Sequence, residues 1–573
     1  MDTSDNKAVY DDDCDLENEP EDEFGSLLQH ENESEYYKIH PLENLDVDKL
    51  LEKRLGEFGR YQKIVYVLVC LPAMMTAGIT LGSVFTEYVP DHRCHIPGCD
   101  NDLIPRYEDA KNLFNFTLPD DNPHCSSYKR KSNDDLLQSS CTKSDFSVTE
   151  SHDCGISRHV FSDGVMSSTL VTEYLLICDQ EWVVPLIQSS YFAGVLVGAI
   201  SFGWLSDLWG RKKTFMISTL ITILSGTLAA SSTSSKMFTI VQFFTAMGQI
   251  GVFQTSFVIG LELVGSSKRV ICGIIIQIFF VIGMLYLAFV AWFFRKWRQI
   301  QLATILPGTV FLTYYFVLPE SIPWLLAKKN YKKAYKVIQL LAKRNRVSVP
   351  SKEEMIKYKK TGDNAMNCDE SLVDLLGRPR MVCRLLIVFL NWFVIVMIYY
   401  GLSISTASLA GDIFVNFTLM SLCEVPGALL SYFGMDLIGR RFSLSSSLLI
   451  CGCSCLMSIL SSKYPSVSSL FFLIGKFGIS ASFTTVYLYT GELFPTKIRS
   501  VCVGMSSMIG RFGSILCPYI VELGANVPWL PMSVFSAASI ITGVLSLLLP
   551  ETRNSALPRN IYEAENVDKF SDV

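Results

Sequence analysis

Twelve apolar runs, each about as long as a helix that crosses a membrane, constrain this chain more than any other feature. Roughly 20 residues of helix span the hydrocarbon core of a bilayer, where backbone polar groups must be satisfied within the helix itself. The runs lie at 64–86, 183–204, 214–232, 238–261, 270–294, 300–318, 385–405, 412–434, 442–461, 468–491, 501–523 and 527–549. The sequence therefore predicts an all-α membrane protein with twelve transmembrane helices.

Basic residues indicate how these helices are oriented. They gather in alternate loops, at 53–60, 211–213, 268–269, 440–441 and 497–499. Because cytosolic loops carry an excess of Lys and Arg, this pattern predicts that both termini are cytosolic. The same reasoning assigns the basic loops to topology and not to a nucleic-acid partner, and it leaves membrane lipid as the surrounding medium. One outer turn departs from the rule, because it holds Arg295, Lys296 and Arg298.

The polar segments divide the chain into parts. We predict an acidic cytosolic tail at 1–60, an N-terminal six-helix half at 61–318 with an extracellular loop at 87–182, a cytosolic linker at 319–384, a C-terminal six-helix half at 385–550 and a cytosolic tail at 551–573. Within the linker, Ala334, Val337, Ile338 and Leu341 share one helical face. This spacing predicts an amphipathic helix that packs under the bundle.

The extracellular loop holds six cysteines, namely Cys94, Cys99, Cys125, Cys141, Cys154 and Cys178. An even number of cysteines in an oxidising compartment predicts disulfides, although six cysteines allow 15 pairings. The alternative is a zinc site formed by His92, Cys94, His95 and Cys99, which disulfide formation would exclude. The loop also contains an acceptor sequence for N-glycosylation at Asn115.

Three charged motifs recur between the two halves with nearly constant spacing. The first is Asp207, Gly210 and Arg211, which recurs as Asp436, Gly439 and Arg440; the second is Glu262 and Arg269, which recurs as Glu492 and Arg499; the third is Pro319 and Glu320, which recurs as Pro550 and Glu551. A repeat of this kind predicts two parallel six-helix halves, as in transporters that rock around a central site.

These repeated charges lie at cytosolic helix ends. We expect Asp207 or Glu262 to pair with Arg211, Arg269 or the counterparts of these arginines when the inner side is closed, and we expect the pairs to break when it opens. Exposed pairs are individually weak, so a gate needs several of them together. The alternative is that the charges only set topology, but acids are not needed for that purpose.

Three ionisable residues fall deep inside predicted helices of the C-terminal half: Glu424, Lys476 and Arg511. Such residues are costly in a membrane and predict a functional site. Two cations and one anion give a positive cavity that suits a carboxylate, and the planar fork of Arg511 can grip one with two hydrogen bonds. Lys476 either contacts the ligand or pairs with Glu424.

Aromatic residues at a similar depth could hold a positively charged group. Trp392 and Tyr399 are seven residues apart, and Phe483 and Tyr487 are four apart, so each pair shares a helical face. A quaternary ammonium against such rings gains about 2 kcal/mol when desolvated. The alternative is ordinary packing between helices.

Several motifs together resemble the organic cation, organic anion and carnitine transporter family of the major facilitator superfamily. They are PDHRCHIPGCDN, GWLSDLWGRKK, PESIPWLLAKKNYKKA, DIFVNFTLMSLCEVPG, GELFPTKIRS and GRFGSILCPY. The amino-acid sequences of these motifs are most similar to those of the carnitine and organic cation branch. In this family cation transporters usually carry an acid at the position of Arg511, whereas anion and carnitine members carry arginine. The resemblance also implies that Trp392, Tyr399, Phe483 and Tyr487 line a pocket, and it adds Phe253, Gln277 and, more weakly, Gln188.

Together these features predict a plasma-membrane transporter for carnitine-like zwitterions or related organic ions, working by alternating access. The alternatives are an organic anion exchanger and, from another class, a sensor or scaffold without flux. An enzyme is not predicted, because nucleophile elbows, metal-ligand pairs and phosphate loops are missing from the sequence, and no cofactor or metal is expected. Sodium symport, exchange of a counter-ion and facilitated diffusion stay open, since the first helix offers only Thr76, Thr80 and Ser83 as oxygen ligands.

Overall fold

A computed structural model describes residues 45–350 and 372–566, apart from short gaps at 57, 97–98, 101–106, 109–114, 120–122, 132–140, 155–158, 266–267, 497, 554, 556 and 559. Within these residues, 11 helical segments are long and apolar enough to cross a membrane, and Leu530–Ser546 is a shorter apolar helix. Together they account for the twelve predicted spans. The acidic stretch before residue 45 lies outside the described residues, so that part of the predicted tail stays a prediction.

The N-terminal half contains six spans. They are α3 (Arg60–Leu81) continued by α4 (Ser83–Thr86), α7 (Val183–Trp209), α8 (Arg211–Ala230), α9 (Ser235–Glu262), α10 (Arg269–Phe294), and a sixth span made of α11 (Trp297–Ile305), η6 (Leu306–Thr313) and α12 (Tyr314–Val317). The sixth span is not one regular helix. Pro307 lacks a backbone N–H, and the chain tightens there into the 3₁₀ turns of η6.

The C-terminal half contains the other six spans. They are α17 (Pro379–Ser405), α18 (Ile413–Leu437), α19 (Arg440–Leu460), α20 (Pro465–Leu493), α21 (Arg499–Asn526) and α22 (Leu530–Ser546). Local signals explain where several of them begin. Proline stands in the first turn of α17, α20 and α22, where its missing N–H is not needed. The Asp412 carboxylate caps α18 by accepting from the N–H groups of Phe414 and Val415.

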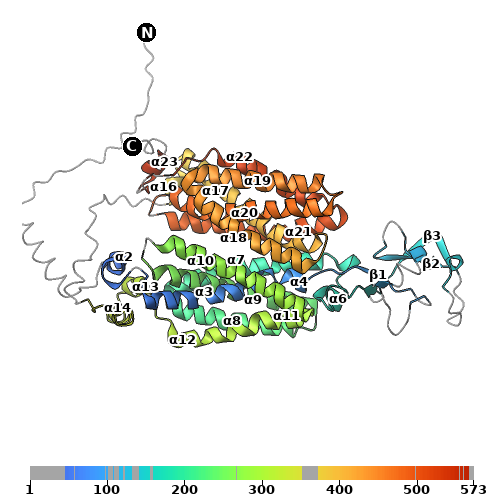
Figure 1. Cartoon of the computed structure of the whole chain (residues 1–573), viewed down its shortest axis with the longest axis horizontal. Helices are drawn as coiled ribbons and strands as arrows, with labels where there is room; N and C mark the ends of the chain where they lie inside the picture. The colour runs from blue at the N-terminus through green and yellow to red at the C-terminus, as the bar shows by residue number, and fades with distance from the viewer. Residues whose placement is uncertain are drawn as a thin grey trace, which may run out of the picture.

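The two halves form two helix bundles that lie side by side (Figure 1). The bundle α17–α22, drawn in orange and red, lies along the bundle of α3 and α7–α12. A disulfide-bonded domain with β1–β3 and α6 extends from one end, which we call the outer end. At the opposite end, the inner end, lie α2 (Val47–Leu50), α13 (Ile322–Ala327) and α14 (Tyr331–Asn345). The fold is therefore an all-α membrane bundle with a small β-containing domain at one end.

That domain is built on two short antiparallel pairs. Strand β1 (His92–Cys94) pairs with β4 (His159–Phe161), and β2 (Ser126–Arg130) pairs with β3 (Phe146–Asp153). All six predicted cysteines form disulfides, which join Cys94 to Cys154, Cys99 to Cys141, and Cys125 to Cys178. The zinc alternative is wrong, because the thiols of Cys94 and Cys99 are consumed by these bonds. Asn115 is exposed at the start of a short 3₁₀ turn, and its glycosylation stays a prediction.

The basic outer turn that departs from the positive-inside rule has a structural explanation. Arg298 forms an ion pair with Glu173 on α6 (Leu170–Tyr174) of the disulfide-bonded domain. Its guanidinium also donates 2.7 Å to the carbonyl oxygen of Ser232. Arg295 lies over the ring of Phe414, 5.9 Å from its centre. Arg298 therefore holds the domain against the bundle, whereas Arg295 contacts α18 of the opposite half.

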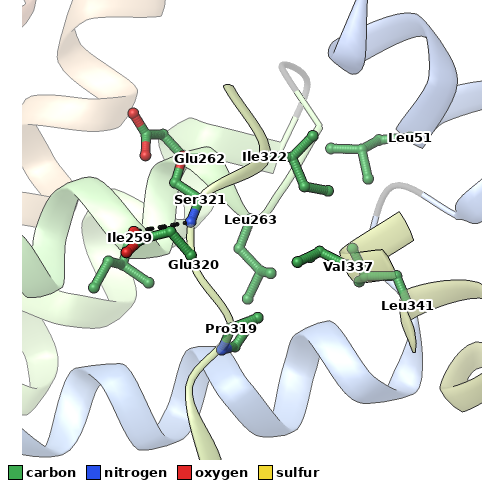
Figure 2. Close-up of a pocket in the computed structure, with 10 residues that line it drawn as sticks. All are labelled: Leu51, Ile259, Glu262, Leu263, Pro319, Glu320, Ser321, Ile322, Val337 and Leu341. Atoms are coloured by element: carbon green, nitrogen blue, oxygen red, sulfur yellow. Dashed lines mark hydrogen bonds between the residues drawn. The ribbon is translucent and has the colours of Figure 1, made fainter. Parts of the chain in front are cut away.

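The inner end carries the amphipathic helix. On α14, Ala334, Ile338 and Leu341 are buried and Val337 is partly buried. Val337 and Leu341 line a small pocket together with Leu51 and with Glu320 and Ser321 of the segment after the sixth span (Figure 2). Its volume is about 20 Å³, which is room for about one water molecule and too little for an organic ion. The apolar face of α14 thus packs under the N-terminal half.

Candidate substrate site

Two of the three predicted ionisable residues meet at the centre of the C-terminal half. The ammonium of Lys476 on α20 lies 3.0 Å from Oε1 of Glu424 on α18, and both side chains are fully buried. Lys476 also donates to the Ser403 hydroxyl at 2.8 Å and lies 3.6 Å from the ring centre of Tyr399. A buried charge requires such compensation. The structure therefore places Lys476 in a pair with Glu424, one of the two roles that the sequence left open.

The four predicted aromatic residues form one continuous row of ring contacts. Ring centres are 4.3 Å apart for Trp392 and Tyr487, 5.4 Å for Tyr487 and Phe483, and 5.1 Å for Phe483 and Tyr399. Trp392 is 1% exposed and its indole N–H donates 3.0 Å to the Thr490 hydroxyl, whereas Tyr487 is 41% exposed. The row therefore begins at Tyr399, beside the Lys476–Glu424 pair, continues through Phe483 to the accessible ring of Tyr487, and ends at the buried Trp392.

Arg511 lies near the middle of α21, at the seam between the halves. Close packing of α21 on α17 fixes its position, because a Cβ atom on Gly510 would lie 3.2 Å from the carbonyl oxygen of Trp392. The half-buried guanidinium interacts electrostatically with the hydroxyl groups of Tyr400 on α17 and Tyr191 on α7. One turn outward, the Ser189 hydroxyl donates 2.7 Å to the Ile515 carbonyl across the same seam. Arg511 therefore faces residues of both halves.

A neutral network in the N-terminal half positions Tyr191. Its hydroxyl lies 3.2 Å from Oγ1 of Thr80 and 3.3 Å from Oε1 of Gln249, and the Gln249 amide donates 3.0 Å to Thr80. All three side chains are buried. Sequence reasoning missed Tyr191 and Gln249, although polar side chains inside apolar runs were a usable signal. Thr80, which the sequence offers as a sodium ligand, has its hydroxyl within this network.

The other candidates of the N-terminal half lie on α7, α9 and α10. Phe253 on α9 packs edge-on against Phe280, with ring centres 6.1 Å apart, and Gln277 on α10 is half-buried. Phe253 packs against the same hydrophobic cluster that contains Trp392 and Tyr399 of the aromatic row. Gln188, the weakest candidate, lies on α7 and interacts with the carboxyl group of Glu87.

The charged motif of the N-terminal half forms a compact cluster at the inner end. Arg211 donates to both carboxylate oxygens of Glu262, at 3.2 and 3.1 Å, and to Asp207 at 2.8 Å. The Glu320 carboxylate accepts from the backbone N–H of Arg211 at 2.9 Å and so caps α8. Gly210, with φ of +99°, makes this approach possible, because a Cβ atom there would lie 2.6 Å from the Glu320 carboxylate.

The same cluster is built again in the C-terminal half. Arg440 donates to Glu492 at 3.0 and 3.2 Å, and its backbone N–H donates 2.8 Å to Glu551. Gly439 again has a positive φ, of +88°. Asp436 lies 4.0 Å from Arg440, whereas its counterpart Asp207 lies 2.8 Å from Arg211. The repeat read from the sequence is therefore also a repeat of side-chain geometry.

The remaining gate candidates differ between the halves. Arg269 does not contact Glu262 but forms an ion pair with Asp48 of α2, at 2.6 Å. Its counterpart Arg499 begins α21 and interacts electrostatically with Glu492. All these pairs join elements of the same half or its flanking segment, so they brace each half at the inner end.

Comparison with known proteins decides the family. A family model described as "Sugar (and other) transporter" matches residues 124–559. The chain is 38% identical to the "Organic cation transporter protein" of Drosophila melanogaster over 90% of this chain and 94% of that one. It is 32% identical to the human "Organic cation/carnitine transporter 2" over 88% and 92%. The chain belongs to the organic cation and carnitine transporter family.

Solved structures agree with this fold. This chain is similar to an inward-open structure of the Escherichia coli xylose transporter XylE. The matched region covers 87% of this chain and 98% of the XylE chain, with a TM-score of 0.57 and 13% sequence identity. That likeness supports the major facilitator fold alone. As a member of the organic cation and carnitine transporter family, the protein is a multi-pass membrane transporter and not an enzyme.

Proposed function

We propose that this transporter carries small zwitterions of the carnitine kind, which combine a carboxylate with a quaternary ammonium. The observation that carries the proposal is the position of Arg511, whose half-buried guanidinium faces Tyr400 and Tyr191 at the seam. Lys476 and Glu424 compensate each other, so Arg511 makes the centre of the C-terminal half positive. A planar guanidinium at such a site binds a carboxylate with two charge-assisted hydrogen bonds.

The aromatic row supplies the second half of the proposed site. Tyr487 presents an accessible ring, and Phe483 and Trp392 contact it from both sides. The negative faces of aromatic rings attract quaternary ammonium groups, which cannot donate hydrogen bonds. In this proposal Tyr487 contacts the ammonium, Trp392 and Phe483 hold its ring, and Tyr399 completes the row. Phe253 and Gln277 would line the opposite wall from the N-terminal half.

The relatives support a zwitterion as well as a cation. The human relative is named for both organic cations and carnitine, and a Drosophila melanogaster relative that is 32% identical over 91% of this chain is named a "Beta-alanine transporter". β-Alanine and carnitine each carry one positive and one negative group. A positive residue at the site favours these over a simple cation, which Arg511 would repel.

Alternating access is the proposed mechanism, with both termini on the cytosolic side of the plasma membrane. Phe85 of α4 stacks on Phe414 and meets Phe417 of α18 edge-on, so aromatic contacts close the seam toward the outer end. The clusters around Arg211 and Arg440 would serve as inner-gate elements that exchange partners when the inner side closes.

An organic anion exchanger is the second candidate, favoured by the same positive residue. It would use Arg511 and would not need the aromatic row. The two functions therefore differ in their response to loss of the Tyr487 ring, which would weaken uptake of a zwitterion and spare uptake of an anion.

The test measures uptake of L-carnitine, choline and glutarate, each with and without sodium, in cells that express the protein. We expect carnitine uptake to exceed that of choline and glutarate by at least about tenfold. Arg511→Ala should abolish carnitine uptake without loss of surface expression. Phe512→Ala is the matched control, because this neighbouring ring is exposed on the outside of the bundle. Normal carnitine uptake by Arg511→Ala would contradict the proposal, and glutarate uptake that exceeds carnitine uptake would favour the exchanger.

A further inference from the structure

Glu87 is a buried acid at the outer end of the first span, and the proposed substrate site does not use it. It is the cap residue that follows α4 (Ser83–Thr86), and it is only 5% exposed. Its Oε2 atom is buried and has no hydrogen-bond partner among the described residues. The side-chain amide of Gln188 on α7 is its polar neighbour. Burial removes hydration from an ionised carboxylate at this position, and the Gln188 amide offsets only part of that cost.

The position of Glu87 ties it to the outer seam. Phe85, two residues earlier, stacks on Phe414 at 5.6 Å and meets Phe417 at 4.9 Å, both on α18 of the opposite half. Ser189, next to Gln188, donates across the seam to Ile515 of α21. Glu87 is therefore buried between segments that hold the halves together. Separation of the halves at the outer end would expose it to water.

The charged groups on the neighbouring elements are engaged elsewhere. At the start of α11, Arg298 pairs with Glu173, and Arg295 lies over the Phe414 ring. On α21, Arg511 interacts with Tyr191 and Tyr400, and Glu522 lies near Glu181, an acid of the same charge. The segment η7 (Thr406–Ser408), which follows α17 and contacts α4, carries no ionisable side chain. On α7, Gln188 is the group that acts on the carboxyl.

We propose that Glu87 is a proton-binding site of the outer gate, which takes up a proton when the outer side closes and releases it when that side opens. A proton fits the site better than a metal ion, because a cation such as sodium needs several oxygen ligands and Glu87 has one amide neighbour. This inference goes beyond the proposed substrate and needs only that the protein alternates its access.

The sign of the effect follows from the two environments. Burial in the closed state raises the pKa of Glu87 to about 7, and the hydrogen bond from the Gln188 amide acts in the opposite direction. In the open state the hydrated carboxyl has an ordinary pKa of about 4.3. Between these values only the closed state holds the proton, so each pH unit upward disfavours closure by about tenfold. Above about pH 7 Glu87 is ionised in both the closed and the open state, so closure no longer depends on pH.

The experiment follows opening of the outer gate without using a substrate. Thr406 on η7 is fully buried, and a cysteine there becomes reachable from outside only when the seam opens. The rate of labelling of Thr406→Cys by a membrane-impermeant thiosulfonate is measured in cells from external pH 5 to 8.5. We expect the rate to rise by up to about tenfold per pH unit and to level off above about pH 7. Adding Glu87→Gln should make it low and independent of pH.

Controls separate Glu87 from other titrating groups. Glu181→Gln, a matched change of an acid two residues before α7, should leave the pH dependence intact, and Glu87→Asp should retain it because the acid is kept. Ala407→Cys is a second reporter on η7 should Thr406→Cys fail to reach the surface. Equal pH dependence with and without Glu87→Gln, or labelling that does not change with pH in the parent, would overturn the proposal. Neither result depends on which substrate is carried.

Discussion

The two halves are nearly alike at their inner ends and differ at their centres. Arg211 with Glu262 and Arg440 with Glu492 repeat the same bidentate contact, and Glu320 and Glu551 cap the following helix in the same way. At the centre, the N-terminal half holds the neutral network of Tyr191, Thr80 and Gln249, whereas the C-terminal half holds Glu424, Lys476 and Arg511.

This difference indicates a division of labour. Elements that change conformation need to act on both halves, so their chemistry is duplicated with the repeat. Recognition of one asymmetric ligand needs different groups on its two sides, so the repeat has diverged at the centre. In the proposed account, the C-terminal half binds the charges of the ligand, and the N-terminal half orients Tyr191 against it.

The largest effect is expected where the halves differ most, at the buried ion pair. Lys476→Met leaves Glu424 buried without a cation, which typically costs about 3–5 kcal/mol. We expect a large loss of thermal stability, measured by the melting temperature of the purified protein in detergent. Combining it with Glu424→Gln removes both charges and should recover most of the loss. A single variant as stable as the parent would show that the pair is not a structural requirement of this half.

A smaller and symmetric effect is expected at the inner ends. Arg211→Ala and Arg440→Ala each remove charge-assisted hydrogen bonds worth about 1.5–3 kcal/mol to a partly buried acid. Each variant should lower the rate of carnitine uptake by about tenfold or more while reaching the cell surface. Lysine at either position should restore little, because it cannot make the bidentate contact. If one of the two alanine variants takes up carnitine at the rate of the parent, the two halves are not equivalent as gate elements.

The fold was largely predictable because its signals are local and repeated. Length and hydropathy identified the twelve spans, and the spacing of charged motifs identified the two halves. The irregular sixth span was not predicted as such, since hydropathy does not register the turn at Pro307. The three disulfide pairings could not be read from six cysteines, because the choice depends on how β1–β4 bring distant residues together.

The candidate site was predictable in its residue types but not in its contacts. Depth along a helix placed Lys476 and Glu424 at one level, and only packing of α18 against α20 determines that they pair. The hydroxyl of Tyr191 in an apolar run was a usable signal of a polar role, but its partners Thr80 and Gln249 depend on how α3, α7 and α9 pack together. Glu87 was missed because it follows the apolar run directly, where an acid looks like the first residue of a loop.

The smallest of these effects is expected at the neutral network. Tyr191→Phe keeps the ring and removes a hydroxyl that bonds to Thr80 or Gln249, which are still bonded to each other. A neutral hydrogen bond contributes about 0.5–1.5 kcal/mol, so the KM for carnitine should rise roughly two- to tenfold. Tyr286→Phe is the matched control, since its hydroxyl bonds to the Ala303 carbonyl between α10 and α11. Loss of all uptake in Tyr191→Phe would mean that the N-terminal half contributes as strongly as the C-terminal half.

The central claim, that Arg511 binds the carboxylate of the ligand, is tested most directly by changing both partners. Uptake of carnitine and of carnitine amide, which lacks the negative charge, is measured in the parent and in Arg511→Gln at equal surface expression. We predict that the parent prefers carnitine by roughly 100-fold and that the variant prefers it by no more than about threefold, as expected for loss of a buried charge-assisted contact worth about 2–3 kcal/mol. A variant that keeps the preference of the parent would contradict the claim, because the carboxylate would then be recognised elsewhere.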